Sequence, residues 1–96
     1  MRYYLSGKIS NGDTEPHNYA HFDEMEERLM LQGHEVFNPA KLEKVGASWE
    51  WYLARDVKWI MEYRPTLLML EGWEGSRGAR LEHELGKLLG LEIEYA

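Results

Sequence analysis

The sequence predicts an α/β fold: a small, doubly wound and mostly parallel sheet of four to five strands, flanked by helices in the three-layer arrangement of Rossmann-like and flavodoxin-like domains. Two observations predict it. Short apolar runs alternate with amphipathic segments in the order β-α-β-α-β-α-β, and the run at 66–70 is apolar without alternation, as in a strand covered by helices on both faces. At 96 residues the chain is expected to form one domain, 1–96.

The first third of the chain is expected to fold as strand, helix and strand. Arg2–Ser6 is an aromatic and aliphatic run that ends at Gly7, and the polar stretch that follows as far as Pro16 is expected to be a loop. Apolar residues recur at helical spacing within 18–31, which predicts an amphipathic helix. Residues 34–37 predict a second short strand.

The rest of the chain is expected to add two helices and two strands. A helix is predicted over 49–61 because its apolar residues share one face, and Pro65 precludes a longer helix. The elements expected after it are a central strand 66–70, a glycine-rich loop 71–77, a helix 78–89 and a final strand 91–95.

Composition excludes several classes of partner and site. The formal net charge is -6 and no cluster of Lys and Arg is present, so polymeric DNA or RNA is not an expected partner. The absence of cysteine excludes disulfides and thiolate metal sites. His17 and His21 form the one close helical pair of histidines, and no carboxylate or cysteine is spaced to complete a zinc site, so neither metal nor cofactor is expected.

Apolar runs and aromatic content predict the location and the assembly. No stretch approaches the ~20 apolar residues of a bilayer span, so a cytosolic location without a membrane partner is expected. Four Trp and six Tyr are many large rings for so short a chain, which favours a homo-oligomer, a dimer or higher. Because 96 residues leave little room for a lid, a neighbouring subunit is expected to close the ligand site.

In open parallel sheets, ligands bind beyond the carboxyl ends of the strands, so the loops after the first and third strands are the candidate sites. The first loop reads Tyr4-Leu5-Ser6-Gly7-Lys8-Ile9-Ser10. Gly7 allows backbone amides to approach a ligand, and Ser6 and Lys8 are suitable donors to an anion. The loop lacks the Walker and dinucleotide glycine patterns, and a simple tight turn at the end of the strand is the alternative interpretation.

The second loop, 71–78, is rich in glycine and leads into a helix whose N-terminal amides favour an anion. Ser76 is a candidate phosphate ligand, and the alternative is that it only caps the helix. Trp73 is a candidate platform for a base, although tryptophans more often belong to a core or an interface.

Two acids are candidate catalytic groups. Glu82 has small and apolar neighbours at helical spacing, including Gly78 and Gly86, so it borders the face that packs on the sheet; an ordinary surface acid is the alternative. Asp56 lies between Arg55 and Val57, and its local pattern alone favours a solvated charge.

These residues resemble a family of small domains of unknown function, frequent in phages and bacteria (DUF4406-like), which in turn resemble nucleoside 2-deoxyribosyltransferases and deoxynucleoside monophosphate N-glycosidases. The resemblance spans nearly the whole chain. It is carried by Tyr4-Leu5-Ser6-Gly7-Lys8-Ile9, Gly33-His34-Glu35-Val36-Phe37-Asn38-Pro39, Arg55-Asp56-Val57, and the run from Gly72 to Gly86.

The resemblance implies a role for several residues. Ser76, Gly78 and Glu82 have the spacing S-x-G-x-x-x-E, in which the serine contacts phosphate and the glutamate is the nucleophile. Tyr4, a further catalytic candidate, would match the aromatic residue of the first strand and Asp56 the acid that assists at the sugar or base. Arg80 and Lys8 depart from the enzymes: Arg80 stands where a small or apolar residue is usual, and Lys8 lies in a loop where they differ.

The implied mechanism is nucleophilic attack by Glu82 on C1′ of a deoxyribosyl group, with water or a second base taking up the sugar. The dipole at the helix N-terminus is expected to favour the ionised glutamate. Three hypotheses follow: an enzyme that cleaves or exchanges the N-glycosidic bond of a deoxynucleoside or its monophosphate, a non-catalytic module that binds a nucleotide, and an assembly protein with a vestigial pocket. All three leave the base unspecified.

Overall fold

The computed structural model describes residues 1–9, 19–42 and 47–96. The elements of these ranges are β1 (Arg2–Ser6), α1 (Tyr19–Leu31), β2 (Glu35–Phe37), the 3-10 helix η1 (Pro39–Leu42), α2 (Trp49–Tyr63), β3 (Thr66–Met69), the 3-10 helix η2 (Trp73–Gly75), α3 (Arg77–Leu89) and β4 (Ile93–Tyr95). Residues 10–16 of the predicted first loop, His17 and the predicted helix start at Asn18 lie outside the described residues. No helix in the described part of the chain is long and apolar enough to cross a membrane.

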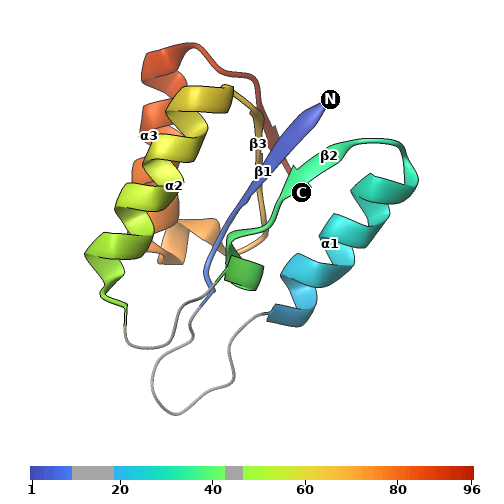
Figure 1. The fold of residues 1–96 in the computed structure, drawn as a ribbon, viewed down its shortest axis with the longest axis horizontal. Coiled ribbons are helices and arrows are strands. Elements are labelled where there is room, and N and C mark those ends of the chain that lie inside the picture. Colours follow the sequence, from blue (N-terminus) through green and yellow to red (C-terminus); the bar gives the residue numbers. More distant parts are fainter. Residues whose placement is uncertain (10–18, 43–46) are drawn as a thin grey trace.

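The four strands form one parallel sheet in the order β2-β1-β3-β4, which confirms the predicted α/β class with four strands (Figure 1). Tyr4 on the inner strand β1 pairs with Phe37 on one side and with Leu67 on the other. After β1 the chain moves outward to β2, and after β3 it moves outward in the opposite direction to β4. The connections therefore diverge between β1 and β3, and that is where open α/β sheets bind ligands.

Helices cover both faces of the sheet, with α1 on one face and α2 and α3 together on the other (Figure 1). Alternate residues of a strand point to opposite faces. On β1, Tyr3 and Leu5 accordingly pack with Phe22 of α1, whereas Tyr4 packs with Ile60 of α2. The sheet is thus the middle of three layers and has a hydrophobic core on each side.

Several elements differ from their predicted boundaries by one or two residues. α2 runs two residues past the predicted end, to Tyr63, because Arg64 adopts a left-handed cap conformation with φ 47° and its amide donates to the carbonyl of Ile60. Pro65 follows at once, as predicted. The strands β2, β3 and β4 are one or two residues shorter than predicted, and η2 forms a short turn inside the predicted glycine-rich loop.

A glycine allows α3 to approach the sheet closely. A Cβ atom at Gly86 would lie 2.5 Å from Cδ1 of Leu67 on β3, closer than side chains tolerate. Glu82 lies one turn before Gly86 on the same face of the helix, so the same close approach carries its side chain to the sheet. Glu82 is only 6% exposed.

Candidate functional site

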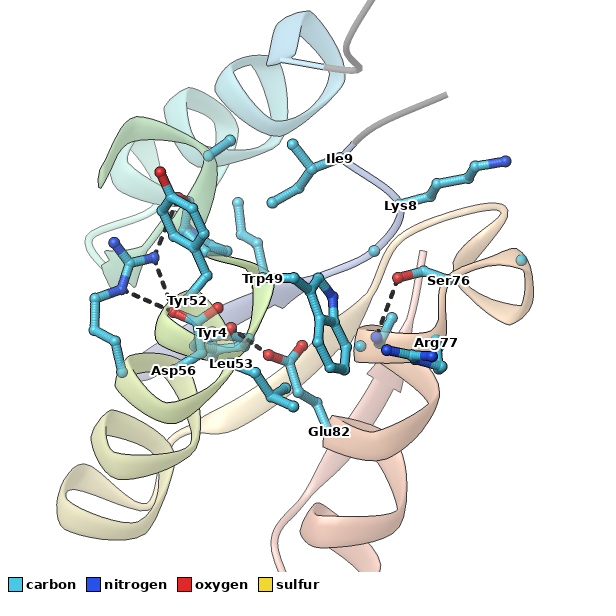
Figure 2. A pocket seen from close by; sticks show the side chains of 18 residues that line it. Tyr4, Lys8, Ile9, Trp49, Tyr52, Leu53, Asp56, Ser76, Arg77 and Glu82 are labelled. Atoms are coloured by element: carbon cyan, nitrogen blue, oxygen red, sulfur yellow. Dashed lines mark hydrogen bonds and ion pairs between the residues drawn. The ribbon is translucent and has the colours of Figure 1, made fainter. Parts of the chain in front are cut away.

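A cavity of about 330 Å³ opens at the divergence point between β1 and β3 (Figure 2). Its walls are the carboxyl end of β1 with the residues that follow it, the start of η1, the first half of α2, and the first turns of α3 with the residues before it. Of the predicted site residues, the cavity is lined by Tyr4, Gly7, Lys8, Ile9, Asp56, Ser76, Gly78 and Glu82. The two loops and the two acids that the sequence singled out therefore meet in one place.

Glu82 is fixed in the cavity by two hydroxyl groups of β1. The Tyr4 hydroxyl donates to Oε2 of Glu82 at 2.6 Å, and the Ser6 hydroxyl donates to Oε1 at 2.7 Å. Tyr4 and Ser6 alternate along the strand with Leu5 between them, so both side chains point to the α3 face. Ser6 is itself buried, and it contributes through Glu82 although it does not line the cavity.

Burial controls the protonation of Glu82. Desolvation raises the pKa of Glu82 to about 8, and the nearby Asp56 adds to the rise, while the bonds from Tyr4 and Ser6 and the charge of Arg55 oppose it. At neutral pH the ligand-free carboxyl is therefore mostly protonated, contrary to the predicted ionised form. The helix dipole does not reverse this because it acts within the first turn, and Glu82 lies in the second turn of α3.

Asp56 is buried and not the solvated acid that its local pattern suggested. It is 8% exposed because it lies three residues after Leu53 and four before Ile60, on the face of α2 that packs on the sheet. That spacing is the signal the local pattern missed. Burial raises the pKa of Asp56, and Arg55 counteracts the rise by donating from Nε and Nη2 to Oδ1 at 3.0 and 2.9 Å.

Arg55 was not predicted as a site residue, yet it holds Asp56 in place. Neighbouring residues on a helix normally diverge. Here the guanidinium folds back, since it also donates to the carbonyl of Pro39 and lies over the rings of Trp51 and Tyr52. Side-chain packing of this kind leaves no mark in the spacing of apolar residues.

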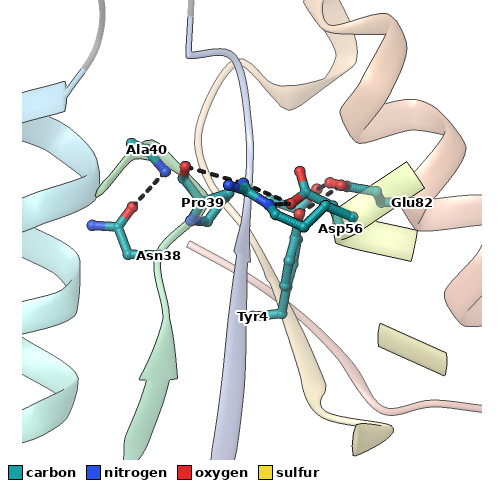
Figure 3. Close-up of polar contacts among 8 residues, drawn as sticks. Tyr4, Asn38, Pro39, Ala40, Asp56 and Glu82 are labelled. Carbon is teal, nitrogen blue, oxygen red and sulfur yellow. Dashed lines mark hydrogen bonds and ion pairs between the residues drawn. The ribbon is translucent and has the colours of Figure 1, made fainter. Parts of the chain in front are cut away.

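Tyr4 lies close to both acids. Its hydroxyl donates to Glu82, and Figure 3 shows the side chains of Tyr4, Asp56 and Glu82 converging. The ring is fully buried and stacks on Phe37 with centroids 5.3 Å apart, which fixes the position of the hydroxyl. Burial, with the two carboxyls, raises the pKa of Tyr4 well above its usual value, so the phenol keeps its proton.

The glycine and serine of the two loops have structural roles as well. A Cβ at Gly7 would lie 3.0 Å from Cβ of Leu70, so the small residue lets the end of β1 pass close to the end of β3. Ser76 caps α3, accepting from the amide of Ala79 at 3.2 Å, so the capping alternative is correct, and the same residue lines the cavity. The side chain of Lys8 reaches across to Gly75. A Cβ atom built on Gly75 would lie 4.0 Å from Nζ of Lys8.

Arg77 and Trp49 form part of the mouth, and sequence reasoning missed both. The Arg77 guanidinium lies 4.1 Å from the centre of the Trp49 ring, which links the N-termini of α3 and α2 across the opening (Figure 2). Trp49 is 43% exposed. The opening therefore carries two cations, Lys8 and Arg77, beside a large exposed ring.

The structure does not bring Trp73 into the cavity, which corrects its prediction as a base platform. Trp73 does not line the cavity but stacks on His83, with centroids 4.4 Å apart, and packs in the core between β3 and α3. Its ring turns toward the C-terminal strand because Tyr95 completes the same aromatic group. The sequence pattern does not indicate whether the Trp73 ring points into the cavity or toward the opposite side of the loop.

Metal ligands do not gather in the part of the chain that the structure describes, where no group of three His, Asp or Glu side chains is arranged to hold an ion. The chemistry of the cavity is that of two buried carboxyls, a phenol and nearby cations. No match to the chain was found among curated proteins or among solved structures. A family model described as a domain of unknown function (DUF4406) matches residues 1–95, and the chain belongs to that family.

Proposed function

We propose that the protein cleaves or exchanges the N-glycosidic bond of a deoxynucleoside or deoxynucleoside monophosphate, with Glu82 as the nucleophile. One observation carries the proposal: the Glu82 carboxyl lies buried in a cavity at the divergence point of the sheet, fixed by hydrogen bonds from Tyr4 and Ser6. A carboxyl held at the wall of a cavity of this size is placed to attack a sugar carbon. The resemblance of the loop motifs to deoxyribosyltransferases supports the same reaction.

The reaction that the geometry supports has two steps. The ionised form of Glu82 is the nucleophile: its oxygen forms a bond to C1′ while the bond from C1′ to the base nitrogen breaks, and Asp56 gives a proton to the leaving base. The glycosyl ester is then attacked at C1′ by water in a hydrolase or by a second base in a transferase. The ionised Asp56 takes up the proton that the attacking group loses, and Glu82 leaves as a carboxylate. Asp56 is suited to proton donation because burial favours its protonated form.

The test is a panel of deoxynucleosides and their monophosphates, incubated with the protein and analysed chromatographically for free base. We expect base release by the wild type and none by Glu82→Gln. Glu84→Gln is a matched control, since Glu84 lies on the same helix with an exposed side chain and should leave release unchanged. Absence of free base from every compound, at protein concentrations that allow a single turnover, would refute the glycosidic proposal.

The protonation of Glu82 favours a second candidate, a module that binds a nucleotide without cleaving it. A neutral carboxyl donates one hydrogen bond and accepts others, which suits recognition of a base or sugar. This candidate predicts stabilisation of the protein without base release: a ligand at 100 times its dissociation constant should add roughly 2.7 kcal/mol to the free energy of unfolding. A panel without either effect would leave the third hypothesis, an assembly role.

A further inference from the structure

We propose that Arg55 is a positioning residue that gives the two oxygens of Asp56 different tasks: Oδ1 is held by the guanidinium, and Oδ2 delivers the proton to the leaving base. The catalytic role of Oδ2 rests on the proposed function, whereas the difference between the two oxygens is a property of the ligand-free protein. The hydrogen bonds at Asp56 carry the proposal, since Nε and Nη2 of Arg55 both donate to Oδ1, at 3.0 and 2.9 Å.

Oδ1 of Asp56 is poorly suited to carry a proton. A carboxyl oxygen has two lone pairs, and two N–H groups bound to the same oxygen occupy both. Protonation of Oδ1 would displace a donor of a guanidinium that stays charged in proteins. Within the described part of the chain, the hydrogen bonds of Asp56 all end on Oδ1, and the side chain lines the cavity. Oδ2 is therefore the oxygen that remains for a proton and for a ligand.

The guanidinium of Arg55 is itself fixed, so it can hold the Asp56 carboxyl in one orientation. Nη2 also donates to the carbonyl of Pro39 at 3.4 Å, and the guanidinium carbon lies 5.6 and 5.4 Å from the ring centres of Trp51 and Tyr52. The side chains of Arg55 and Asp56 are only 21% and 11% exposed, and such burial strengthens hydrogen bonds between charged groups. Rotation of the carboxyl would break both bonds to Oδ1, so the two oxygens do not exchange places.

The proton transfer balances with this division of tasks. The bond between Oδ2 and its proton breaks as the bond from C1′ to the base breaks, and the base takes the proton and keeps the electron pair of the glycosidic bond. The charge left on Asp56 is shared with Oδ1, where Arg55 stabilises it. In the second step Oδ2 takes up the proton that the attacking water or base loses. Arg55 thus acts on the reaction through Asp56.

Arg55→Lys tests the proposal, because lysine keeps the charge but lacks the rigid pair of donors that holds Oδ1. A departing nucleobase needs the proton of Asp56, whereas 4-nitrophenolate departs without one. We expect the variant to lower kcat for base release from a deoxynucleoside by roughly 30-fold with KM within about twofold, and to slow nitrophenolate release from 4-nitrophenyl 2-deoxyriboside by less than about threefold. Equal losses on the two substrates would overturn the proposal. A higher KM with an unchanged kcat would also overturn it, because Arg55 would then contact the substrate directly.

Arg64→Lys is the matched control. Arg64 donates to the carbonyl of Leu89 from the exposed end of α2, so the same substitution there should leave both rates unchanged. A second comparison uses Asp56→Asn, which cannot give a proton. Adding Arg55→Lys to this variant should change base release by less than about twofold, because the two residues act as one unit. A further loss as large as that caused by Arg55→Lys alone would show that Arg55 acts independently of Asp56, and the proposal would be rejected.

A measurement on the ligand-free wild type needs no variant and separates the proposal from the proposed function. The Nε–H resonance of Arg55 is followed by NMR while the carboxyl of Asp56 is titrated. Tyr4 from β1 and Glu82 from α3 are the other titratable groups that converge on this carboxyl (Figure 3). We expect the Nε–H proton to stay protected from exchange with water in both protonation states of Asp56, because the guanidinium keeps Oδ1 in each.

The two possible failures can be told apart. Loss of the protected Nε–H signal when Asp56 takes up its proton would place that proton on Oδ1, and the proposal would be overturned even if the protein releases base. A wild type that keeps the protected signal but releases no base would refute the proposed function and the catalytic role of Oδ2, while the difference between the two oxygens would stand.

Discussion

The Tyr4 hydroxyl lies 2.6 Å from Oε2 of Glu82, which joins two residues that are 78 positions apart in the sequence. Tyr4 belongs to β1, and Glu82 belongs to α3, the helix that follows β3. β1 and β3 are the two neighbouring strands between which the connections of the sheet diverge. The candidate site thus exists only when β1 and β3 are paired and α3 is docked. Stability and the protonation of the site are consequently coupled, and that coupling can be measured.

The free energy of unfolding is expected to fall as pH rises. Burial holds the pKa of Glu82 at about 8 in the folded protein against an ordinary value of 4.5, so the folded state binds this proton more tightly than the unfolded state. The resulting stabilisation is fully present below pH 4.5 and is lost as pH rises toward 8. A shift of this size corresponds to a loss on the order of 5 kcal/mol.

Urea unfolding at a series of pH values, for the wild type and Glu82→Gln, measures this effect. The glutamine cannot ionise, so the difference between the two proteins should grow in favour of the variant between pH 5 and 9. Glu84→Gln, on the exposed side of the same helix, should follow the wild type. Parallel curves for the wild type and Glu82→Gln would show that folding does not raise the pKa of Glu82.

The close approach of α3 to β3 predicts that Gly86→Val is strongly destabilising. A valine would place atoms in the space of Cδ1 of Leu67, which lies 2.5 Å from the position of a Cβ and is surrounded by core. We expect a loss of about 2–3 kcal/mol in the free energy of unfolding, as for overpacked cores. Lys87→Val, with the same new side chain on the exposed face, should change stability by less than about 1 kcal/mol. Equal effects would mean that helix propensity, and not contact, determines the cost.

Most of the fold follows from patterns of apolar residues that can be read directly in the sequence. The three helices and four strands were predicted because each amphipathic stretch has a helical period and the apolar run at 66–69 has none. The order of strands within the sheet depends on which faces pack together, and that is a property of the whole chain. Ends were predicted less well, because caps such as that of Arg64 depend on one residue adopting an unusual φ.

Site residues were predicted where the location of the side chain follows from its position along a helix. They were missed where that location depends on how side chains pack. Glu82 has small neighbours one turn away, and this places it against the sheet. Asp56 occupies a buried position between Leu53 and Ile60, but its charge suggested solvent. Arg77 lies over the ring of Trp49, and Trp73 stacks on the ring of His83. These contacts determine the roles of Arg77 and Trp73, and no local sequence pattern encodes them.

Two cations at the cavity mouth predict a preference for an anionic ligand. Lys8 and Arg77 flank the N-terminus of α3, where free backbone amides also favour a phosphate. If the proposed substrate carries a 5′ phosphate, Lys8→Gln and Arg77→Gln should each weaken binding of a deoxynucleoside monophosphate by roughly tenfold and leave binding of the nucleoside within about twofold. Isothermal titration calorimetry of each variant with the monophosphate and with the nucleoside measures the two changes in affinity. Arg80→Gln is the control, because the Arg80 guanidinium donates to the carbonyl of Glu74 and does not line the cavity.

We propose that the protein is a homodimer in which a second copy covers the cavity mouth. Trp49, which lines the cavity, and Trp51, two residues later in α2, are each 43% exposed, which leaves two large rings partly open to solvent. Interfaces favour such rings, and a charge placed among them is costly to bury. Trp51→Glu should therefore shift the protein to a monomer in light scattering. Leu31→Glu introduces the same charge at a residue that is 82% exposed at the end of α1, on the opposite side of the sheet, and should leave the dimer intact. A wild-type monomer at concentrations where base is released would contradict the proposal, and dissociation by both variants would place the interface elsewhere.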